Sequence, residues 1–456
     1  MNSIFIFRRD FRVTDNIGFN KCYKNSKTVY PIFIFTPEQI KKNSFKSNNA
    51  VQFMIESLLD LDKKINITFY YGDYEDVIKS IIKTKKINAI FTNTDYTKYA
   101  IQRDNNILKI CKKYKIKFNK YHDICLLPPG SVLNKTNTYY QKFTPYYNEH
   151  LKKTVDTPKK MNVNKSKIKS LSTKYKISNS KLKDFYKENN NITVRGGRDN
   201  VLKIVSKIGN FKTYDKTRDT LSQETTRLSA YLKFGCISIR EIYSIFKKKF
   251  GVKHALIRQL IWRDFYYHLG YGYIDRFGKS LKPQYDNIKW DNNPTLFKKW
   301  CDGETGFPIV DACMKELNTS GYMHNRGRLI VSSFLIKNLQ ISWEKGEKYF
   351  AQNLVDYDVL VNNGNWQWAS GSGADSQPYF RIFSPISQST KHDKDCKYIK
   401  KWLPNLKNIE NRHLHDWEKY NHLHNLKKLN YVKPIIDYSK SRDVTISMYK
   451  KALVKK

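Results

Sequence analysis

Charged and amide side chains gather in the segment LVDYDVLVNN, which contains Asp356, Asp358 and Asn362. Upstream, Arg328 lies at the polar start of an apolar segment with helical spacing. An arginine and two aspartates can form a buried charge network, and a buried charge must be paired or must bind a ligand. The residues alone leave two interpretations open, a ligand site and a structural salt bridge.

Two tryptophans, Trp366 and Trp368, lie two positions apart in the segment NNGNWQWASGSG, residues 362–373. A tryptophan in a core is usually surrounded by Leu, Ile and Val, whereas the neighbours here are Asn, Gly and Ser. This composition predicts that both rings are presented to a ligand rather than buried, with the small residues leaving room for it. All eight tryptophans lie at or after Trp262, which is typical of a specialised interior or simply of a large helical core.

Two further stretches carry residue types that bind anions or planar ligands. Thr225, Thr226 and Ser229 place hydroxyl groups near a predicted helix start, where free backbone N–H groups and the helix dipole favour phosphate. Trp262 and Arg263 adjoin within an aromatic helix, and an arginine beside aromatic rings suits an anionic or planar ligand. Taken alone, each stretch favours ordinary structure, a capped helix in the first and core packing in the second.

The first 130 residues predict a sheet, because short apolar runs alternate with segments of helical periodicity. The runs SIFIF, VYPIFIF, ITFYY and AIFT are β-branched or aromatic, as buried strands are. Strands that alternate with helices predict a parallel, doubly wound sheet. No GxGxxG, GxxxxGKS or GxxxxGKT motif occurs, so an ordinary dinucleotide or ATP site is poorly supported. We expect strands at residues 3–7, 29–35, 67–71 and 89–92, and helices at residues 50–64, 76–86 and 101–115.

Residues 131–195 differ in character from the segments on either side. The stretch LPPGSVL interrupts the alternation, and the following residues are rich in Lys, Ser and Asn with little periodicity. We interpret this segment as a long surface connector. From residue 196 onward, apolar residues recur every three or four positions, which predicts helices. The sequence therefore predicts an α/β domain at residues 1–130, a connector at 131–195 and an all-α domain at 196–456.

The chain is strongly basic, with 83 Lys and Arg against 41 Asp and Glu among 456 residues and a formal net charge of +42. This surplus favours a polyanionic partner such as nucleic acid, although an AT-rich genome also enriches Lys, Asn, Ile and Tyr. Seven scattered cysteines with no CxxC pair argue against a disulfide framework or a structural zinc. No apolar stretch is long enough to span a membrane, and the N-terminal apolar run is too short for a secretion signal. We therefore expect a soluble intracellular protein in a reducing compartment, without a membrane partner.

Eight stretches in order along nearly the whole chain make the sequence resemble the photolyase/cryptochrome family, and most of all the class I cyclobutane pyrimidine dimer photolyases. One such stretch could arise by chance, but eight in family order are very specific, and only the connector near residues 150–195 lacks a match. The stretches are FRRDFRVTDN (7–16), KFTPYY (142–147), TRLSAYLKFGCIS (226–238), LIWRDFY (260–266), TGFPIVDACMKEL (305–317), MHNRGR (323–328), NNGNWQWASGSGADSQPYFRIFSP (362–385) and YIKKWLP (398–404).

The resemblance implies a fold and an activity. The fold is an N-terminal α/β antenna domain followed by a helical domain that holds FAD. The activity is light-driven DNA repair, in which excited reduced FAD passes an electron to a pyrimidine dimer, the dimer splits and the electron returns. The implied partner is DNA that contains pyrimidine dimers, bound by a monomer whose lysine surplus grips the phosphates.

The resemblance also assigns a flavin site. Asn362 matches the residue beside flavin N5, where a neutral amide can form a hydrogen bond without supplying a proton, which favours an enzyme over a photosensor. Trp366, Trp343 and Trp290 match an electron-transfer chain from the flavin to the surface; electron tunnelling falls steeply with distance, so such a chain needs short hops. Without the family, these three tryptophans would be interpreted as core. The residues that match positions around FAD are Tyr214, Thr225, Thr226, Leu228, Ser229, Arg263, Arg328, Asp356, Asp358 and Asn362.

A second group of matches faces DNA. Trp368 and Trp262 would line a cavity for the flipped lesion, and a damaged, poorly stacked pair flips most easily. Gln259 stands where cyclobutane-dimer photolyases carry Glu and (6-4) photolyases carry Gln, and Leu329 replaces the usual Met. Asn325 stands where (6-4) photolyases carry His, so we expect the cyclobutane dimer, with the (6-4) product as the alternative. The DNA-facing matches are Arg218, Gln259, Trp262, Asn325, Trp368, Gln388 and Lys391.

The N-terminal domain bears on the identity of a second, antenna chromophore. The folate-binding type carries His and an Asn-Glu pair at positions that here are Asn43, Tyr99 and Ala100. The segment YTKYAIQRD is more similar to the deazaflavin-binding type. We therefore expect a deazaflavin in preference to folate if an antenna is bound.

Two functions of other classes compete with repair. A cryptochrome-type blue-light receptor would share the flavin site, but Asn362 favours an enzyme, and the chain ends soon after the last family motif. A non-catalytic basic DNA-binding protein would keep the lysine surplus without needing a flavin pocket. DNA binding without FAD binding would support that third function.

Overall fold

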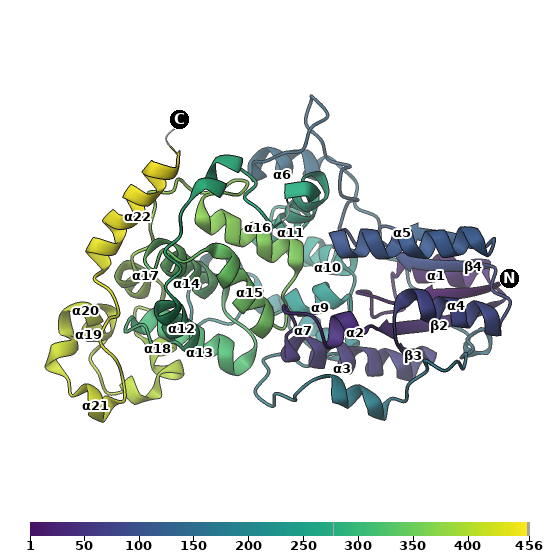
Figure 1. The fold of residues 1–456 in the computed structure, drawn as a ribbon, viewed down its shortest axis with the longest axis horizontal. Helices are drawn as coiled ribbons and strands as arrows, with labels where there is room; N and C mark the ends of the chain where they lie inside the picture. The colour runs from purple at the N-terminus through teal and green to yellow at the C-terminus, as the bar shows by residue number, and fades with distance from the viewer. Residues whose placement is uncertain (277, 454–456) are drawn as a thin grey trace.

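The N-terminal part is a five-stranded parallel sheet in the order β3-β2-β1-β4-β5, which confirms the predicted α/β fold (Figure 1). The computed structural model describes residues 1–276 and 278–453. β1, β2 and β4 are almost wholly buried, as expected of apolar strands covered on both faces. β5, KFNKY, is a polar edge strand, so an apolar run could not reveal it. The strands are β1 Asn2–Ile6, β2 Thr28–Phe35, β3 Thr68–Tyr71, β4 Ala89–Asn93 and β5 Lys117–Tyr121.

Alternating side chains of the strands face two different layers of helices. Ile4 and Ile6 of β1 pack with α4 and α5, whereas Phe5 packs with α1 and α3 in a cluster that continues into the helical part. The predicted helices correspond to α3, α4 and α5, and the short, largely polar α1 carries too little apolar periodicity to be predicted. These helices are α1 Ile17–Asn25, α2 Pro37–Ile40, α3 Asn48–Ile65, α4 Tyr74–Thr84 and α5 Lys98–Lys113.

The prediction that residues 131–195 form a surface connector is wrong for much of that segment. It contains α6 (Phe143–Leu151), which packs against α11 (Ala255–Gly272) of the helical part. Further along, its backbone bonds to β2 and β3, and Leu182 and Phe185 of a 3₁₀ helix are buried. Isolated apolar residues without periodicity make these contacts, so the local pattern resembles a linker. The boundaries of the three predicted parts stay a prediction.

The second half of the chain is all-α, as predicted, and α16 lies against α11, α14 and α15 (Figure 1). Trp300, Trp343, Trp366 and Trp417 are buried in one cluster with Leu, Ile and Val side chains. The remaining helices are α7 Arg198–Ser206, α8 Tyr214–Thr217, α9 Ser229–Phe234, α10 Ile239–Phe250, α12 Pro294–Asp302, α13 Pro308–Ser320, α14 Asn325–Lys337, α15 Trp343–Asn353, α16 Val359–Ser370, α17 Pro385–His392, α18 Lys397–Trp402, α19 Asn411–His415, α20 Trp417–Tyr420, α21 Leu426–Leu429 and α22 Tyr438–Leu453.

The predicted presentation of both rings in NNGNWQWASGSG is wrong for Trp366, because most of this segment is the helix α16. Trp366 is 2% exposed, whereas Trp368 is half-buried. A Cβ added at Gly364 would lie 2.3 Å from the ring of Tyr266. One added at Gly346 would lie 2.3 Å from the ring of Trp366. These glycines therefore admit neighbouring rings of the protein itself rather than a ligand.

Candidate functional site

Asp356 is the centre of the charge network that the sequence predicts. It lies between α15 and α16, and its two oxygens accept hydrogen bonds from Nη2 of Arg328, at 3.1 and 2.9 Å. Ser229, the first residue of α9, donates its hydroxyl to the same carboxylate at 2.6 Å. Asp356 is buried and Arg328 half-buried. Ser229 and Asp356 are 127 positions apart in the sequence, so this hydrogen bond connects two distant segments of the helical part.

Asp358 precedes α16 and forms a second network, with residues that the sequence analysis missed. Its Oδ2 accepts hydrogen bonds from Arg9 and from the hydroxyl of Tyr267, the latter at 2.6 Å. Burial alone would raise the pKa of Asp358, but the guanidinium groups of Arg9 and Arg263 outweigh burial and lower the pKa to about 2. Arg9 is 349 positions away from Asp358, and its one local signal is its place shortly after the apolar run of β1.

Three buried polar atoms beside these networks have no hydrogen-bond partner within residues 1–276 and 278–453. They are Oδ1 of Asp358, Nη2 of Arg263 and Nδ2 of Asn362. An unpaired buried donor or acceptor costs about 1–3 kcal/mol, so such atoms mark a place for a polar ligand. The edge of an isoalloxazine ring offers both acceptors and a donor, which complement two free donors and one free acceptor. The residues present therefore fit FAD.

The segment before α9 carries the residues predicted to meet the phosphates and ribitol of FAD. Thr225 shares a hydrogen bond with the hydroxyl of Tyr322 at 3.1 Å, and the guanidinium of Arg328 lies 5.4 Å from the centre of that ring. Tyr322 thus brings this segment to the Arg328–Asp356 pair, although no motif singled it out. Burial raises the pKa of Tyr214 to about 12. Tyr214, Thr225 and Thr226 are half-buried, and Leu228 is buried.

The three tryptophans of the predicted electron chain differ in burial. Trp366 of α16 and Trp343, the first residue of α15, are each 2% exposed, whereas Trp290 is half-buried. The ring centre of Trp366 lies 4.9 Å from that of Phe350 and 6.4 Å from that of Trp300. Trp290 is therefore nearer the surface than the other two, and the order of the chain stays a prediction.

Gln259, Trp262 and Trp368 are half-buried residues of α11 and α16, the helices that also carry Arg263 and Asn362. One face of Trp262 is covered by α6, because the Phe143 ring stacks on it with 3.6 Å between centres and 6° between planes. The stretch KFTPYY, to which the sequence assigned no role, thus packs against one face of this tryptophan. Trp262 is held rigidly, with only part of its ring free for a ligand.

The other predicted DNA-facing residues lie where the α8 segment, α14 and α17 meet. Arg326 of α14 forms a salt bridge of 2.8 Å with Asp219, the residue after Arg218. The backbone N–H of Leu221 bonds to the carbonyl of His392, the last residue of α17, at 2.9 Å. These contacts bring residues from three distant parts of the chain to one surface. Asn325 and Lys391 are exposed there, and Arg218 and Gln388 are half-buried.

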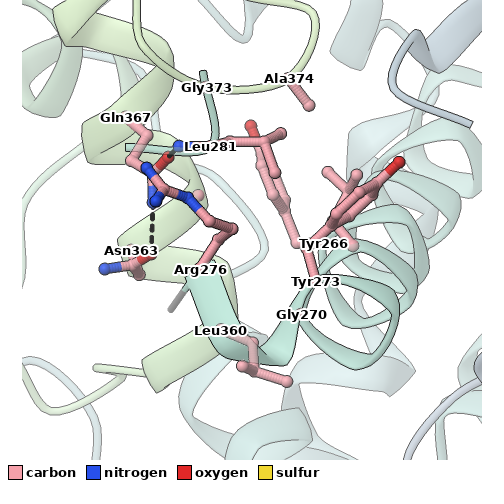
Figure 2. A pocket seen from close by; sticks show the side chains of 12 residues that line it. Tyr266, Gly270, Tyr273, Arg276, Leu281, Leu360, Asn363, Gln367, Gly373 and Ala374 are labelled. Atoms are coloured by element: carbon pink, nitrogen blue, oxygen red, sulfur yellow. Dashed lines mark hydrogen bonds between the residues drawn. The ribbon is translucent and has the colours of Figure 1, made fainter. Parts of the chain in front are cut away.

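A small cavity between α11 and α16 is lined by other residues than those predicted (Figure 2). Its volume is about 40 Å³, room for a few water molecules at most and not for a flavin. Gln367 donates a hydrogen bond to Oδ1 of Asn363 at 2.9 Å, and both amides line the cavity. Tyr266, Tyr273 and Arg276 line other sides of it. The flavin site is thus recognised by its unpaired buried atoms rather than by this cavity.

Charged residues also gather at the carboxyl ends of β1 and β4, where the strand order reverses, and doubly wound sheets bind ligands at such a point. Arg8 pairs with Asp104 at 2.8 Å, yet its Nε and Nη1 are buried without a hydrogen-bond partner among the described residues. Arg9 lies 3.7 Å from Asp95, which follows β4. The unpaired nitrogens of the buried Arg8 favour an anionic or strongly polar ligand at this point.

Membrane spans, metal sites and disulfides are other features that a chain of this size can carry. No helix in the described residues has the length and apolar character needed to cross a membrane. No group of three or more His, Cys, Asp and Glu side chains in the same residues is arranged to hold a metal ion. All seven cysteines are buried free thiols.

The chain is similar to known proteins along its length. A family model described as DNA photolyase matches residues 3–163, and one described as the FAD binding domain of DNA photolyase matches residues 256–451. Together the two models cover the sheet of the N-terminal part and the helices that carry Arg263, Arg328 and Asp358.

Individual relatives are similar over nearly their whole length. A deoxyribodipyrimidine photo-lyase of Buchnera aphidicola subsp. Baizongia pistaciae is 36% identical over 98% of this chain and 97% of the relative. The deoxyribodipyrimidine photo-lyase of Escherichia coli strain K12 is 30% identical over 98% of each. The crystal structure of an archaeal photolyase from Sulfolobus tokodaii with two FAD molecules superposes with a TM-score of 0.89, at 37% identity, over 99% of this chain and 100% of that one.

Proposed function

The chain belongs to the DNA photolyase family, and from this membership we infer that it is a deoxyribodipyrimidine photo-lyase. It uses light to split cyclobutane pyrimidine dimers in DNA. When bound, reduced FAD supplies the photochemistry, absorbing light and lending an electron to the dimer. The protein supplies binding, orientation and electrostatics. The observation that carries the placement of the site is the set of three unpaired buried atoms on Arg263, Asp358 and Asn362.

We propose that two groups of residues hold FAD. Arg263, Asp358 and Asn362 bind the edge of the isoalloxazine ring, because their unpaired donors and acceptor then gain partners. The segment that holds Tyr214, Thr225, Thr226, Leu228 and Ser229 binds the ribitol and phosphates. The pairing of Arg328 with Asp356 supports this placement, because it leaves no bare carboxylate to repel the phosphates.

Asn362 provides a hydrogen bond to flavin N5 from a side chain that cannot give up a proton. The amide is buried at 9% exposure, and its Nδ2 has no partner in the described part of the chain. A carboxyl group at this position would supply a proton and change the course of flavin reduction. This residue therefore supports repair over photoreception as the function.

Trp290, Trp343 and Trp366 pass electrons inward, from the surface toward the flavin, during its photoreduction. The greater exposure of Trp290 supports its place at the surface end, because Trp343 and Trp366 are each only 2% exposed. Trp343→Phe tests it: light-driven reduction of bound FAD, followed by absorbance, should slow at least tenfold. Repair by chemically reduced enzyme should not change, because the repair electron does not use the chain.

Damaged DNA binds on the surface shared by α11, α14, α16 and α17. Trp262 and Trp368 stack on the flipped dimer, while Gln259 and Asn325 form hydrogen bonds to its bases. Arg218, Gln388 and Lys391 contact flanking phosphates, so affinity falls with salt. The exposure of Asn325 and Lys391 supports this arrangement. The enzyme acts as a monomer.

Gln259 is the one observation that favours a (6-4) photolyase, the second candidate. A light-dependent repair assay on two oligonucleotides decides between them, one with a thymine cyclobutane dimer and one with a (6-4) product, each with a dark control. Repair of the first alone is expected. Repair of the second alone would reassign the lesion, and repair of neither by FAD-loaded reduced enzyme would contradict the enzymatic function.

We propose that an antenna chromophore binds at the crevice between β1 and β4, and that it is a deazaflavin rather than folate. The unpaired nitrogens of the buried Arg8 support a ligand with anionic or carbonyl oxygens there. The structure from Sulfolobus tokodaii holds two FAD molecules, so a second FAD is the other outcome to test. Mass spectrometry of the chromophores released from purified protein distinguishes deazaflavin, folate, FAD and none.

A further inference from the structure

Lys337, the last residue of α14, is a buried amine with an unusual set of partners. It is 2% exposed. Its Nζ donates hydrogen bonds to the carbonyls of Ser370 and Tyr379, at 3.3 and 3.1 Å. It also lies 3.8 Å from the centre of the Tyr449 ring, within the range of a cation–π contact. In the described part of the chain no carboxylate forms a salt bridge with it, so carbonyls and an aromatic face take the place of a counter-ion.

These partners belong to the elements that end at the DNA-facing surface. Ser370 is the last residue of α16, the helix that carries Trp368, and a cation at a helix C-terminus is favoured by its free carbonyls and dipole. Tyr379 lies in the irregular segment 371–383 that follows. Lys337 therefore ties the end of α16 to the middle of that segment.

The C-terminal helix α22 completes this contact from the other side. Ser441, Thr445 and Tyr449 recur every four residues and are all buried against the end of α14. Thr445 donates its hydroxyl to the carbonyl of Lys337, and Tyr449 donates to the carbonyl of Ser370 at 2.8 Å. The amine of Lys337 on α14 and the hydroxyl of Tyr449 on α22 thus bind the same carbonyl, that of Ser370 at the end of α16.

The segment held in this way presents an aromatic side chain to solvent. The ring of Tyr379 stacks on that of Tyr449 with 5.4 Å between centres and 3° between planes. The next residue, Phe380, is 59% exposed, and Arg381 is exposed as well. An exposed ring and cation on irregular backbone contribute more to binding if the backbone is fixed before the ligand arrives, because less conformational entropy is then lost.

We propose that Lys337, held over the Tyr449 ring, is a positioning residue for damaged DNA. It fixes the end of α16 and the segment 371–383 against α22, so that Trp368 and Phe380 are presented together. The proposal rests on the proposed function, in which this surface binds the dimer. It assigns to the C-terminal helix a part in substrate binding, although α22 contributes no residue to the predicted site.

The test uses FAD-loaded protein and an oligonucleotide with a single thymine cyclobutane dimer. Lys337→Met should raise the Kd for this DNA at least tenfold, because both carbonyls and the ring lose their cation. The absorbance of bound FAD and its rate of photoreduction should stay at wild-type values. Lys450→Met removes the same charge from an exposed neighbour of Tyr449 and should change the Kd less than twofold.

The pH dependence of binding separates positioning from a merely structural role. Burial lowers the pKa of Lys337 to about 7, so the cation and its contacts weaken as pH rises from 6 to 8.5. The phenol that faces it is that of Tyr449, with Tyr285 beside it; burial raises the pKa of both, so neither carries charge in that range. The Kd of the wild type should rise over this range more steeply than that of Lys337→Arg, which stays charged.

A second pair of variants, at Tyr449, tests the proposal even if Lys337→Met does not fold. Tyr449→Leu removes the ring and should weaken dimer binding severalfold, whereas Tyr449→Phe keeps the ring and should cost less than threefold. Equal Kd values for Lys337→Met, Tyr449→Leu and wild type would overturn the proposal, as would loss of FAD together with DNA binding in both. If the wild type itself shows no preference for the dimer, the proposed function fails instead.

Discussion

Two buried polar regions of this molecule differ in how completely their atoms are paired. The first, here called the junction network, connects the α/β part to α10. Both oxygens of Asp123 accept hydrogen bonds from guanidinium groups, at 2.6 Å from Arg12 and 2.8 Å from Arg240. Both oxygens of Asp15 are bonded as well, one of them to Nε of Arg240 at 2.8 Å. The junction network consists of Arg12, Asp15, Asp123, Ser238 and Arg240.

The second region, the proposed flavin site, has the same residue types with incomplete pairing. Asp358, Arg263 and Asn362 each leave one buried atom without a partner in the described residues. Carboxyl pKa values do not separate the regions: in both, burial alone would raise the pKa, and two arginines lower that of Asp123 as they lower that of Asp358. The pairing of the carboxylates separates them. Both oxygens of Asp15 and of Asp123 are bonded, although Nε of Arg12 in the same network lacks a partner among the described residues, whereas Asp358 keeps one oxygen free for a ligand.

Breaking the junction network should have the largest effect on stability. Arg240→Met leaves Asp15 and Asp123 short of a buried partner, and breaking a buried pair costs about 3–5 kcal/mol. Denaturant titration should show that loss in the free energy of unfolding both with and without FAD. Lys248→Met, on the exposed side of the same helix, should change it by less than about 0.5 kcal/mol. An effect of Arg240→Met that vanished in the FAD-loaded protein would contradict a purely structural network.

Acid should act on the flavin site through Asp358. Its pKa is lowered from 3.8 to about 2, so the stability it provides is complete above about pH 4 and is lost as pH falls toward 2. The linked free energy is about 2 kcal/mol. Asp358→Asn should flatten the free energy of unfolding between pH 4 and pH 2, measured by denaturant titration. Asp199→Asn, an exposed acid, should leave the wild-type slope, and a slope retained in Asp358→Asn would refute the assignment.

Filling the unsaturated region with an apolar group should produce opposite changes in stability and binding. Asn362→Leu removes a buried donor that lacks a partner, so the FAD-free protein should gain about 1 kcal/mol of unfolding free energy. The same change removes a ligand contact, so the FAD Kd, measured by flavin fluorescence, should rise about tenfold. Loss of stability in the FAD-free protein would mean that the amide has a structural partner.

The smallest effect on FAD affinity is expected from removing a hydrogen bond that the protein already makes within the proposed flavin site. Tyr267→Phe removes the hydroxyl that donates to Asp358 at 2.6 Å but leaves Arg9 in place. FAD affinity should fall only a few-fold, since a single hydrogen bond contributes about 1 kcal/mol. Tyr271→Phe on the exposed side of α11 is the matched control and should not change the FAD Kd measured by fluorescence titration.

Local patterns predicted much of the fold and failed in recognisable places. Apolar runs predicted four strands and periodicity predicted α3, α4 and α5, because buried elements must be apolar where they touch the core. The polar edge strand β5 and the short α1 have no such requirement. The segment NNGNWQWASGSG looked like a ligand-facing loop, yet tertiary contacts make it a helix in which Gly364 accommodates Tyr266.

The chemistry of the site divides in the same way. Arg328 and Asp356 were predicted to share a charge network because few other arrangements suit such residues beside apolar helices, and they do pair. Arg9 was not predicted, because its partner Asp358 lies 349 positions away and nothing in either local sequence links them. The sequence by itself determined the residue types, the alternation of strands and helices, and the family. Only the tertiary structure decided which buried charges are satisfied and which are left for a ligand, because each hydrogen bond depends on groups that distant segments bring together.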